Sequence, residues 1–306
     1  MAHSGTVGGF GDSTSYGKRA KCVSGFLALI GQLKRGAWTI SQSPRARDVE
    51  LHLLFAKGKR PDRDEIAAFA GRLPALSVSH DPAGTARPEV SAEDGDDTRS
   101  LVHGEGDWIE LLRDGLTFDL AGLAPGAAVP FPEPAHRFDL AALPAAADFE
   151  ALTLSPGPHL ATGGHSMPLM RGLLALACDM VRQFDELAAV VWGPAQSAIG
   201  RRFFESATSA WLDGGPFPAL GLTSFVQTPD GALESIGLAF WIGQELRIEP
   251  PLTADRVAAT RLGIRLVNHL VITGALEDDD RIVAPDGTRL ALRPSRTRAL
   301  VSVWRE

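Results

Sequence analysis

Two Asp-Gly pairs, each placed between two apolar runs, constrain the fold more than any other feature. Asp114-Gly115 divides residues 108–120, and Asp286-Gly287 divides residues 281–294. An Asp-Gly pair readily adopts the positive φ angles of a tight hairpin turn. Both stretches therefore predict antiparallel strand pairs, and the sheets should be at least partly antiparallel rather than doubly wound.

Helical patterns alternate with the strand patterns. Residues 49–56 alternate as a strand with one buried side. Asp62 and Glu65 then have the spacing of a capping box, which predicts a helix over 62–73. Further helices are predicted over residues 166–187, over 201–214, and from an N-cap at Thr253 to a terminal Gly274. The fold class is therefore α+β, with mixed, partly antiparallel sheets and packed helices.

Four segments follow from these patterns. They are a Gly/Ser-rich leader (1–47) expected to be disordered, an N-terminal α+β half (48–120), a Pro/Ala-rich connector (121–157), and a C-terminal α+β half (158–306). Both halves contain a strand–helix–strand unit that begins with His-Leu, at residues 52–53 and at 159–160. We expect a ferredoxin-like arrangement in each half, produced by a duplication.

Composition excludes several classes of function. A net charge of −7 argues against a nucleic-acid partner, because nucleic-acid binders usually carry a concentrated basic patch. Only 2 cysteines are present, so a disulfide framework is excluded and a reducing cytoplasm fits best. No lysine follows Lys59, which removes Schiff-base, P-loop and protein-kinase chemistry from the C-terminal body. Neither a cofactor nor a metal is expected.

A basic-flanked apolar run near the start, residues 23–30, leaves three readings open. It is too short to span a bilayer, so no integral membrane segment is expected. It could be a signal sequence, an amphipathic segment that docks on a membrane or partner, or the product of a gene start assigned too far upstream.

The stretch Gly164-His165-Ser166-Met167 resembles most of a G-x-S-x-G nucleophile elbow. On chain order, Ser166, then Asp230 or Asp255, then His269 could form a triad; Cys178 is a second candidate nucleophile.

Three features oppose catalysis by Ser166. The fifth position is Pro168 rather than glycine, the preceding strand 159–162 is half polar, and no oxyanion loop precedes it. The simpler interpretation makes Ser166 a helix N-cap, where His165 and Ser166 could hold an anion against the backbone N–H groups. Cys178 is then a structural thiol, because no sequence neighbour would lower its pKa.

Charged alternation follows Phe240-Trp241 and Gly243, with Glu245, Arg247 and Glu249 on one face of a strand. This pattern suits a solvated outer face of an antiparallel sheet or a polar site, and we count Glu245 among the candidate ligand-binding residues. Histidines at 52, 80, 103, 159 and 165 could converge if the halves pack together, but their spacing matches no metal motif.

The order of elements over about residues 158–303 resembles the bacterial family called domain of unknown function 4261. The matching features are a strand ending in Ala-Val-x-Trp at 189–192, paired aromatics at 203–204, and a Gly-rich segment at 237–245 before a last helix. Phe240-Trp241 stands where the family has a Phe-Gly pair. The resemblance implies a fold and supplies no catalytic residues.

These observations predict a binding or regulatory module of a bacterial cytoplasm that recognises a protein or a small molecule. The alternative is a serine or cysteine hydrolase that uses Ser166 or Cys178 with His269.

Overall fold

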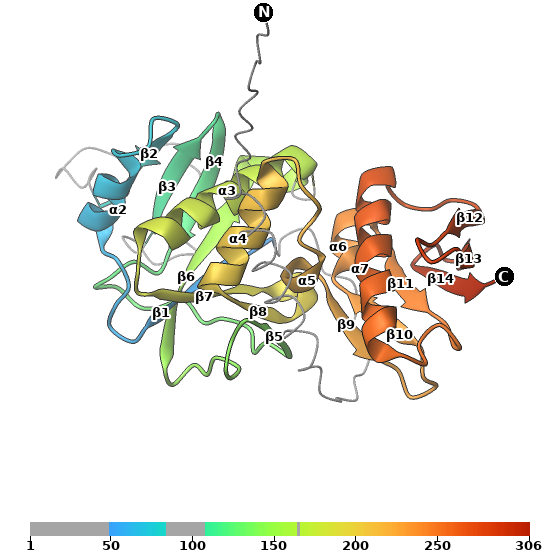
Figure 1. Cartoon of the computed structure of the whole chain (residues 1–306). Helices are drawn as coiled ribbons and strands as arrows, with labels where there is room; N and C mark the ends of the chain where they lie inside the picture. The colour runs from blue at the N-terminus through green and yellow to red at the C-terminus, as the bar shows by residue number, and fades with distance from the viewer. Residues whose placement is uncertain (1–48, 84–107, 164–165) are drawn as a thin grey trace, which may run out of the picture. The chain divides into compact units, whose positions relative to one another are not determined.

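The computed structural model describes residues 49–83, 108–163 and 166–306, all within the compact unit Arg35–Glu306. The described strands form two sheets, and helices cover one face of each (Figure 1). This architecture confirms the predicted α+β class. The predicted leader, residues 1–47, lies outside the described ranges. Of the described helices, none is both long and apolar enough to cross a bilayer.

The first sheet has eight strands in the order β2-β3-β4-β6-β1-β7-β8-β5. These strands are β1 (Leu51–Ala56), β2 (Leu76–His80), β3 (Trp108–Arg113), β4 (Leu116–Ala121), β5 (His136–Phe138), β6 (Phe149–Pro156), β7 (Leu187–Trp192) and β8 (Ser197–Gly200). Neighbours pair antiparallel, except that β5 runs parallel to β8 at one edge.

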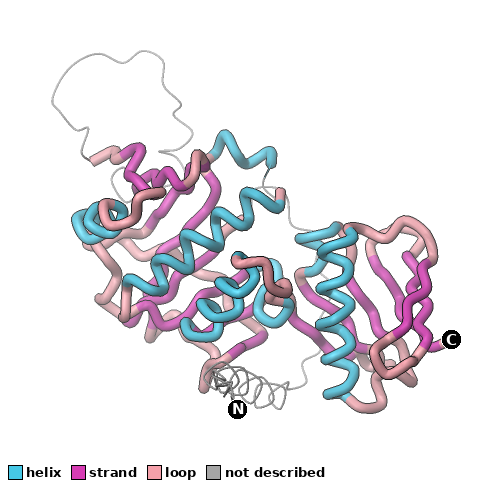
Figure 2. The backbone as a smooth tube through the Cα atoms, turned by 45° about the horizontal axis from the view of Figure 1, so that its top comes forward, coloured by secondary structure: helices cyan, strands magenta, loops and turns pink. Residues whose placement is uncertain are grey.

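Strand β1 is buried on both faces, not on one as predicted. Leu51, Leu53 and Phe55 point to the face that carries α2 (Arg63–Ala70), α3 (Met167–Gln183) and α4 (Arg201–Leu212). Helices α3 and α4 lie side by side across this face (Figure 2). On the opposite face, Leu54 belongs to a small apolar cluster that Phe131 and Leu140 cover. Residues between β4 and β6 therefore form a second layer over the sheet.

Local sequence signals confirm several element boundaries. The Asp62 side chain accepts a hydrogen bond from the Glu65 N–H at 2.9 Å, and the Glu65 side chain accepts one from the Asp62 N–H at 3.0 Å, which completes the capping box. Asp114 and Gly115 turn the β3–β4 hairpin with φ angles of 50° and 80°. These short-range devices fix α2 and the hairpin independently of the tertiary structure.

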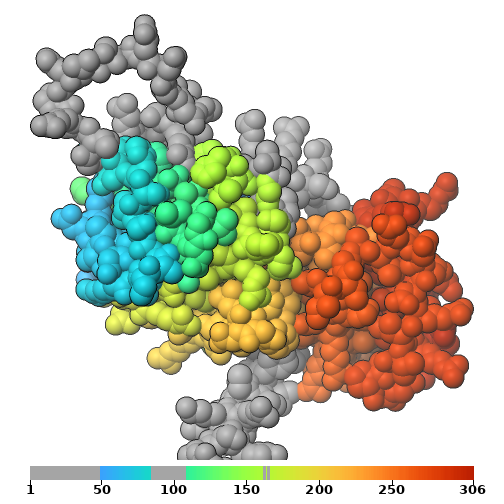
Figure 3. Space-filling model, turned by 90° about the horizontal axis from the view of Figure 1, so that it is seen from above, coloured from blue at the N-terminus to red at the C-terminus, as the bar shows by residue number. Residues whose placement is uncertain are grey.

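The second sheet has six strands in the order β12-β13-β14-β11-β10-β9. They are β9 (Ser224–Gln227), β10 (Leu233–Ile236), β11 (Glu245–Ile248), β12 (Asp280–Val283), β13 (Arg289–Pro294) and β14 (Leu300–Arg305). Strand β11 runs parallel to β14, and the other neighbours are antiparallel. The residues coloured orange to red in Figure 3, which include this sheet, gather in one body.

Helix α7 (Arg256–Thr273) packs on this second sheet close to the short helices α5 (Ala219–Leu222) and α6 (Leu238–Ile242). A Cβ at Gly263 would lie only 2.7 Å from the Phe225 ring, so the absent side chain allows α7 to approach the sheet closely. The helix ends at Gly274 as predicted. Its N-cap is Asp255 rather than Thr253, because the Asp255 carboxylate accepts hydrogen bonds from the N–H groups of residues 257 and 258.

The predicted division into two ferredoxin-like halves is wrong. Strands β1 to β4 come from the predicted N-terminal half, yet they share a sheet with β7 and β8 from the C-terminal half. The predicted connector, residues 121–157, supplies edge strand β5 and interior strand β6. Because β6 is buried on both faces over residues 151–154, it lacks the alternation that identifies a half-exposed strand.

The predicted strand 159–162 is also wrong, since these residues lie in the 3-10 helix η2 (Pro158–Gly163). The half-polar composition noted in the sequence agrees with that outcome. Up to Gly163, the last described residue before Ser166, the chain is a 3-10 helix and not the strand that precedes a nucleophile elbow.

Candidate functional site

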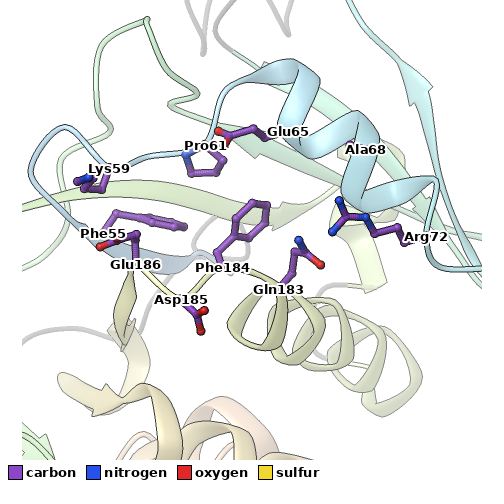
Figure 4. A pocket seen from close by; sticks show the side chains of 10 residues that line it. All are labelled: Phe55, Lys59, Pro61, Glu65, Ala68, Arg72, Gln183, Phe184, Asp185 and Glu186. Carbon is purple, nitrogen blue, oxygen red and sulfur yellow. The ribbon is translucent and has the colours of Figure 1, made fainter.

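A surface cavity of about 280 Å³ lies between α2, the end of β1 and the carboxyl end of α3 (Figure 4). Residues 55–72 line one side, and residues 183–186 line the other. Its volume is close to the lower end of the range for small-molecule sites, about 300–1,000 Å³. Pairing of β1 with β7 brings these two distant segments of the chain together.

Two phenylalanines lie at the base of this cavity, and only one of them, Phe184, is partly exposed. Phe55 is the penultimate residue of β1 and is fully buried, with 0% of its surface exposed. Phe184 caps the end of α3 in an extended conformation, and its ring centroid lies 6.2 Å from that of Phe55 and 5.6 Å from that of Phe69. The half-buried Phe184 ring remains partly accessible from the cavity. An apolar group of a ligand could pack against it.

The rim carries five charged side chains: Lys59, Glu65, Arg72, Asp185 and Glu186. Two of the carboxylates are already engaged. Glu65 accepts from the Asp62 N–H at 3.0 Å, and Asp185 forms an ion pair with Arg201 at 3.1 Å.

Across the described ranges, no ion pair or side-chain hydrogen bond engages Lys59, Arg72 or Glu186. Two cationic groups and one carboxylate are therefore available to a ligand. The five rim side chains together carry a formal charge of −1, because a carboxylate that accepts a hydrogen bond keeps its charge.

Ser166 begins α3 as predicted, but it does not act as a hydrogen-bonding cap. Its backbone has the extended conformation of an N-cap, whereas its hydroxyl makes no capping hydrogen bond. The residue is exposed. His165, its predicted partner in anion binding, lies outside the described residues.

Cys178 is a buried thiol on α3. None of its surface is exposed, and burial raises its pKa to about 11, although a hydrogen bond with Ser209 and the charge of Arg182 oppose the shift. A thiol with this pKa is almost fully protonated at neutral pH and is therefore a poor nucleophile. The arrangement agrees with the structural role that the sequence favoured.

His269 lies on α7, far along the chain from both nucleophile candidates. Helix α7 packs with α5, α6 and the second sheet, whereas α3 packs with α4 and the first sheet. Within the part of the chain that the structure describes, no hydrogen bond joins the His269 imidazole to Ser166 or Cys178. His269 is therefore not placed as a general base for either candidate, because a base must approach its nucleophile to hydrogen-bond distance.

Glu245 serves the protein's own backbone. Its carboxylate accepts hydrogen bonds from the N–H groups of Gly237 (2.8 Å), Leu238 (3.2 Å) and Ala239 (3.1 Å), and from the Ser235 hydroxyl. Burial raises the pKa of Glu245 above its usual range, and these donors offset part of the rise. The carboxylate therefore occupies an internal anion site at the start of α6 rather than a solvated face.

The rest of the predicted charged alternation forms an ion-pair network. The Arg247 guanidinium contacts Asp230, Glu234 and Glu249, with its Nε 2.7 Å from Glu249 Oε1. These acidic partners hold the pKa of Arg247 above its usual range even though burial opposes this. The charged side chains of Arg247 and Glu249 are therefore paired within the protein.

A buried polar group on the first sheet escaped the sequence analysis. Glu110 on β3 lies directly opposite Asp119 on β4, and both are buried on the face away from α3. The Ser79 hydroxyl donates to the Glu110 carboxylate at 2.7 Å, and both acidic residues have further partners. Glu110 and Asp119 are separated from the Asp114-Gly115 turn by the same number of residues. This spacing in a hairpin predicts that the two residues lie opposite each other, and it was the sequence signal for the pair.

His52 lies on the same face, in the central strand β1. Its Nδ1 is 3.3 Å from the Thr153 hydroxyl, and burial lowers its pKa to about 4. The imidazole is therefore neutral at physiological pH. His159 Nε2 lies 3.0 Å from the Thr117 hydroxyl on β4, so His52 and His159 each bind a threonine and not each other. In the described residues, no group of three His, Cys, Asp or Glu side chains is placed to hold a metal ion.

Comparison with known proteins finds no matching family model, and no curated protein or solved structure matches the chain. The resemblance over about residues 158–303 therefore stays a prediction. The functional argument depends on the geometry of the sites themselves.

Proposed function

We propose that this chain is a non-catalytic binding module, and that a small ligand binds in the cavity between α2 and the end of α3. The observation that carries the proposal is the juxtaposition of the half-buried Phe184 ring with two unengaged cationic side chains, Lys59 and Arg72. Ligand sites combine apolar walls with a few polar groups in the same way. By contrast, the Glu245 and Arg247 clusters are satisfied internally.

The proposed setting is a bacterial cytoplasm. Low cysteine content and the resemblance to a bacterial family support this setting.

The competing proposal is a hydrolase that uses Ser166 or Cys178 with His269. The raised pKa of the Cys178 thiol and the separate packing of α3 and α7 argue against it. Covalent labelling of Ser166 by a fluorophosphonate probe, abolished by Ser166→Ala, would favour the hydrolase over the binding module.

A fragment screen with a cavity-blocking variant tests the proposal directly. Ala68 on α2 lines the cavity and is exposed, so Ala68→Trp should fill the site without disturbing the core. Ala67→Trp is the matched control, because its neighbouring position is exposed but does not line the cavity. We expect fragments detected by ligand-observed NMR to bind the natural chain and Ala67→Trp, and to be lost with Ala68→Trp. Equal binding to all three proteins, or no fragment at all, would contradict the proposal.

A further inference from the structure

The free charges of the cavity are not distributed evenly around its floor. Arg72 and Gln183 lie at one end, and Lys59 and Glu186 lie at the other, with the phenylalanine rings between them (Figure 4). Lys59 and Glu186 have opposite charges and lie at the same end. Arg72 is the one charged lining side chain at its end, and no ion pair engages it in the described part of the chain.

From this asymmetry, and resting on the proposed function, we infer that the ligand is a small aryl or alkyl carboxylate whose anionic group binds Arg72 and whose apolar body covers Phe184. A guanidinium presents parallel N–H donors that match the two oxygens of a carboxylate. The Gln183 amide at the same end can donate a further hydrogen bond.

In the described residues, no rim carboxylate forms an ion pair with Arg72. Glu65 accepts a hydrogen bond from the backbone of Asp62, and the exposed Asp185 pairs with Arg201 at 3.1 Å. Glu186 lies at the opposite end of the cavity (Figure 4). Arg72 is exposed and the Phe184 ring is half-buried, and both side chains line the cavity.

Three probes of similar size and different charge test the inference: phenylacetate, 2-phenylethylamine and 2-phenylethanol. Isothermal titration of the full chain should show the tightest binding for phenylacetate. Arg72→Ala should weaken phenylacetate binding by about tenfold or more, as expected for loss of a charged hydrogen-bonding partner. Arg72→Lys should give an intermediate loss, because it keeps the charge but not the paired donors.

Arg261→Ala is the matched control. Arg261 is an exposed arginine on α7, so this substitution changes the net charge by the same amount as Arg72→Ala. Equal loss in Arg261→Ala and Arg72→Ala would overturn the inference, because the effect would then reflect overall charge. Preferential binding of the amine or the alcohol would overturn the ligand class. If that binding were still blocked by Ala68→Trp, the proposed binding function would survive, whereas insensitivity to Ala68→Trp would contradict both.

Discussion

Replacing Glu245 by alanine should destabilise the second sheet more than any change at an exposed carboxylate. The Glu245 side chain receives hydrogen bonds from three consecutive backbone N–H groups and from the Ser235 hydroxyl. Each hydrogen bond to a charged group contributes about 1.5–3 kcal/mol, but contributions within one network are not additive. Since Glu245 is half-buried, water can replace part of the lost interaction. We expect the free energy of unfolding to fall by about 3 kcal/mol.

Glu245→Gln should cost less, about 1–2 kcal/mol, because one amide oxygen can still accept from the N–H groups of Gly237 and Ala239. The new NH₂ group would then face the Leu238 N–H, which is also a donor. Glu277→Ala is the control. The Glu277 side chain is 76% exposed and its ion pair with Arg298 spans 3.6 Å, so the change should cost less than about 0.5 kcal/mol.

Equilibrium unfolding in urea, followed by tryptophan fluorescence, measures all three variants. Trp241 lies four residues before Glu245 and contacts Phe240 and Phe217, so its emission should report on this region. Added formate should restore part of the stability of Glu245→Ala by occupying the vacated anion site. A loss below about 1 kcal/mol for Glu245→Ala would refute the view that this carboxylate organises α6.

Three further outcomes follow from buried groups. Burial lowers the pKa of His52 from 6.5 to about 4, so the unfolded chain takes up this proton first as the pH falls. The free energy of unfolding should therefore drop by about 3 kcal/mol from pH 6.5 towards pH 4, and the same pH dependence in His52→Leu would contradict this. The Cys178 thiol, with a pKa of about 11, should react with a disulfide reagent at pH 8 only when the protein unfolds. The Cys22→Ser variant leaves Cys178 as the one thiol, and rapid reaction of this variant in its folded state would contradict the burial of Cys178. Gly263→Ala should lower the free energy of unfolding by about 1–3 kcal/mol, because the alanine Cβ would lie 2.7 Å from the Phe225 ring. An unchanged urea midpoint would contradict this and would show that α7 can shift away from the sheet.

Sequence patterns predicted the elements whose signals are local. The Asp62–Glu65 capping box and the Asp114-Gly115 turn are each decided by a few neighbouring residues. The missed strand β6 has no such signal, since its burial on both faces removes the alternation and its partners, β1 and β4, lie far away in the sequence. Long-range pairing therefore decided the architecture, and the predicted division into two separate halves failed for that reason.

The candidate site was hidden for the same reason. Lys59 and Arg72 meet Phe184 and Glu186 only because β1 pairs with β7, and neither segment carries a ligand-binding motif. Glu245 was singled out by its alternation with Leu246, but the pattern could not distinguish a solvent-facing carboxylate from one bound by the protein's own N–H groups. Those N–H donors reach the Glu245 carboxylate only because α6 packs against β11, and this tertiary contact cannot be predicted from the alternation.

The central position of β1 determines when the first sheet can assemble during synthesis. Residue 52 leaves the ribosome long before its neighbour Thr153, which follows it by 101 residues, and β7 is made later still. At about 5–20 residues per second, the nascent strand waits several seconds with both edges unpaired. Its apolar sequence, Leu-His-Leu-Leu-Phe-Ala, is then exposed to other chains. Expression conditions and chaperone supply should therefore affect the soluble yield strongly, and fragments ending before residue 187 should aggregate.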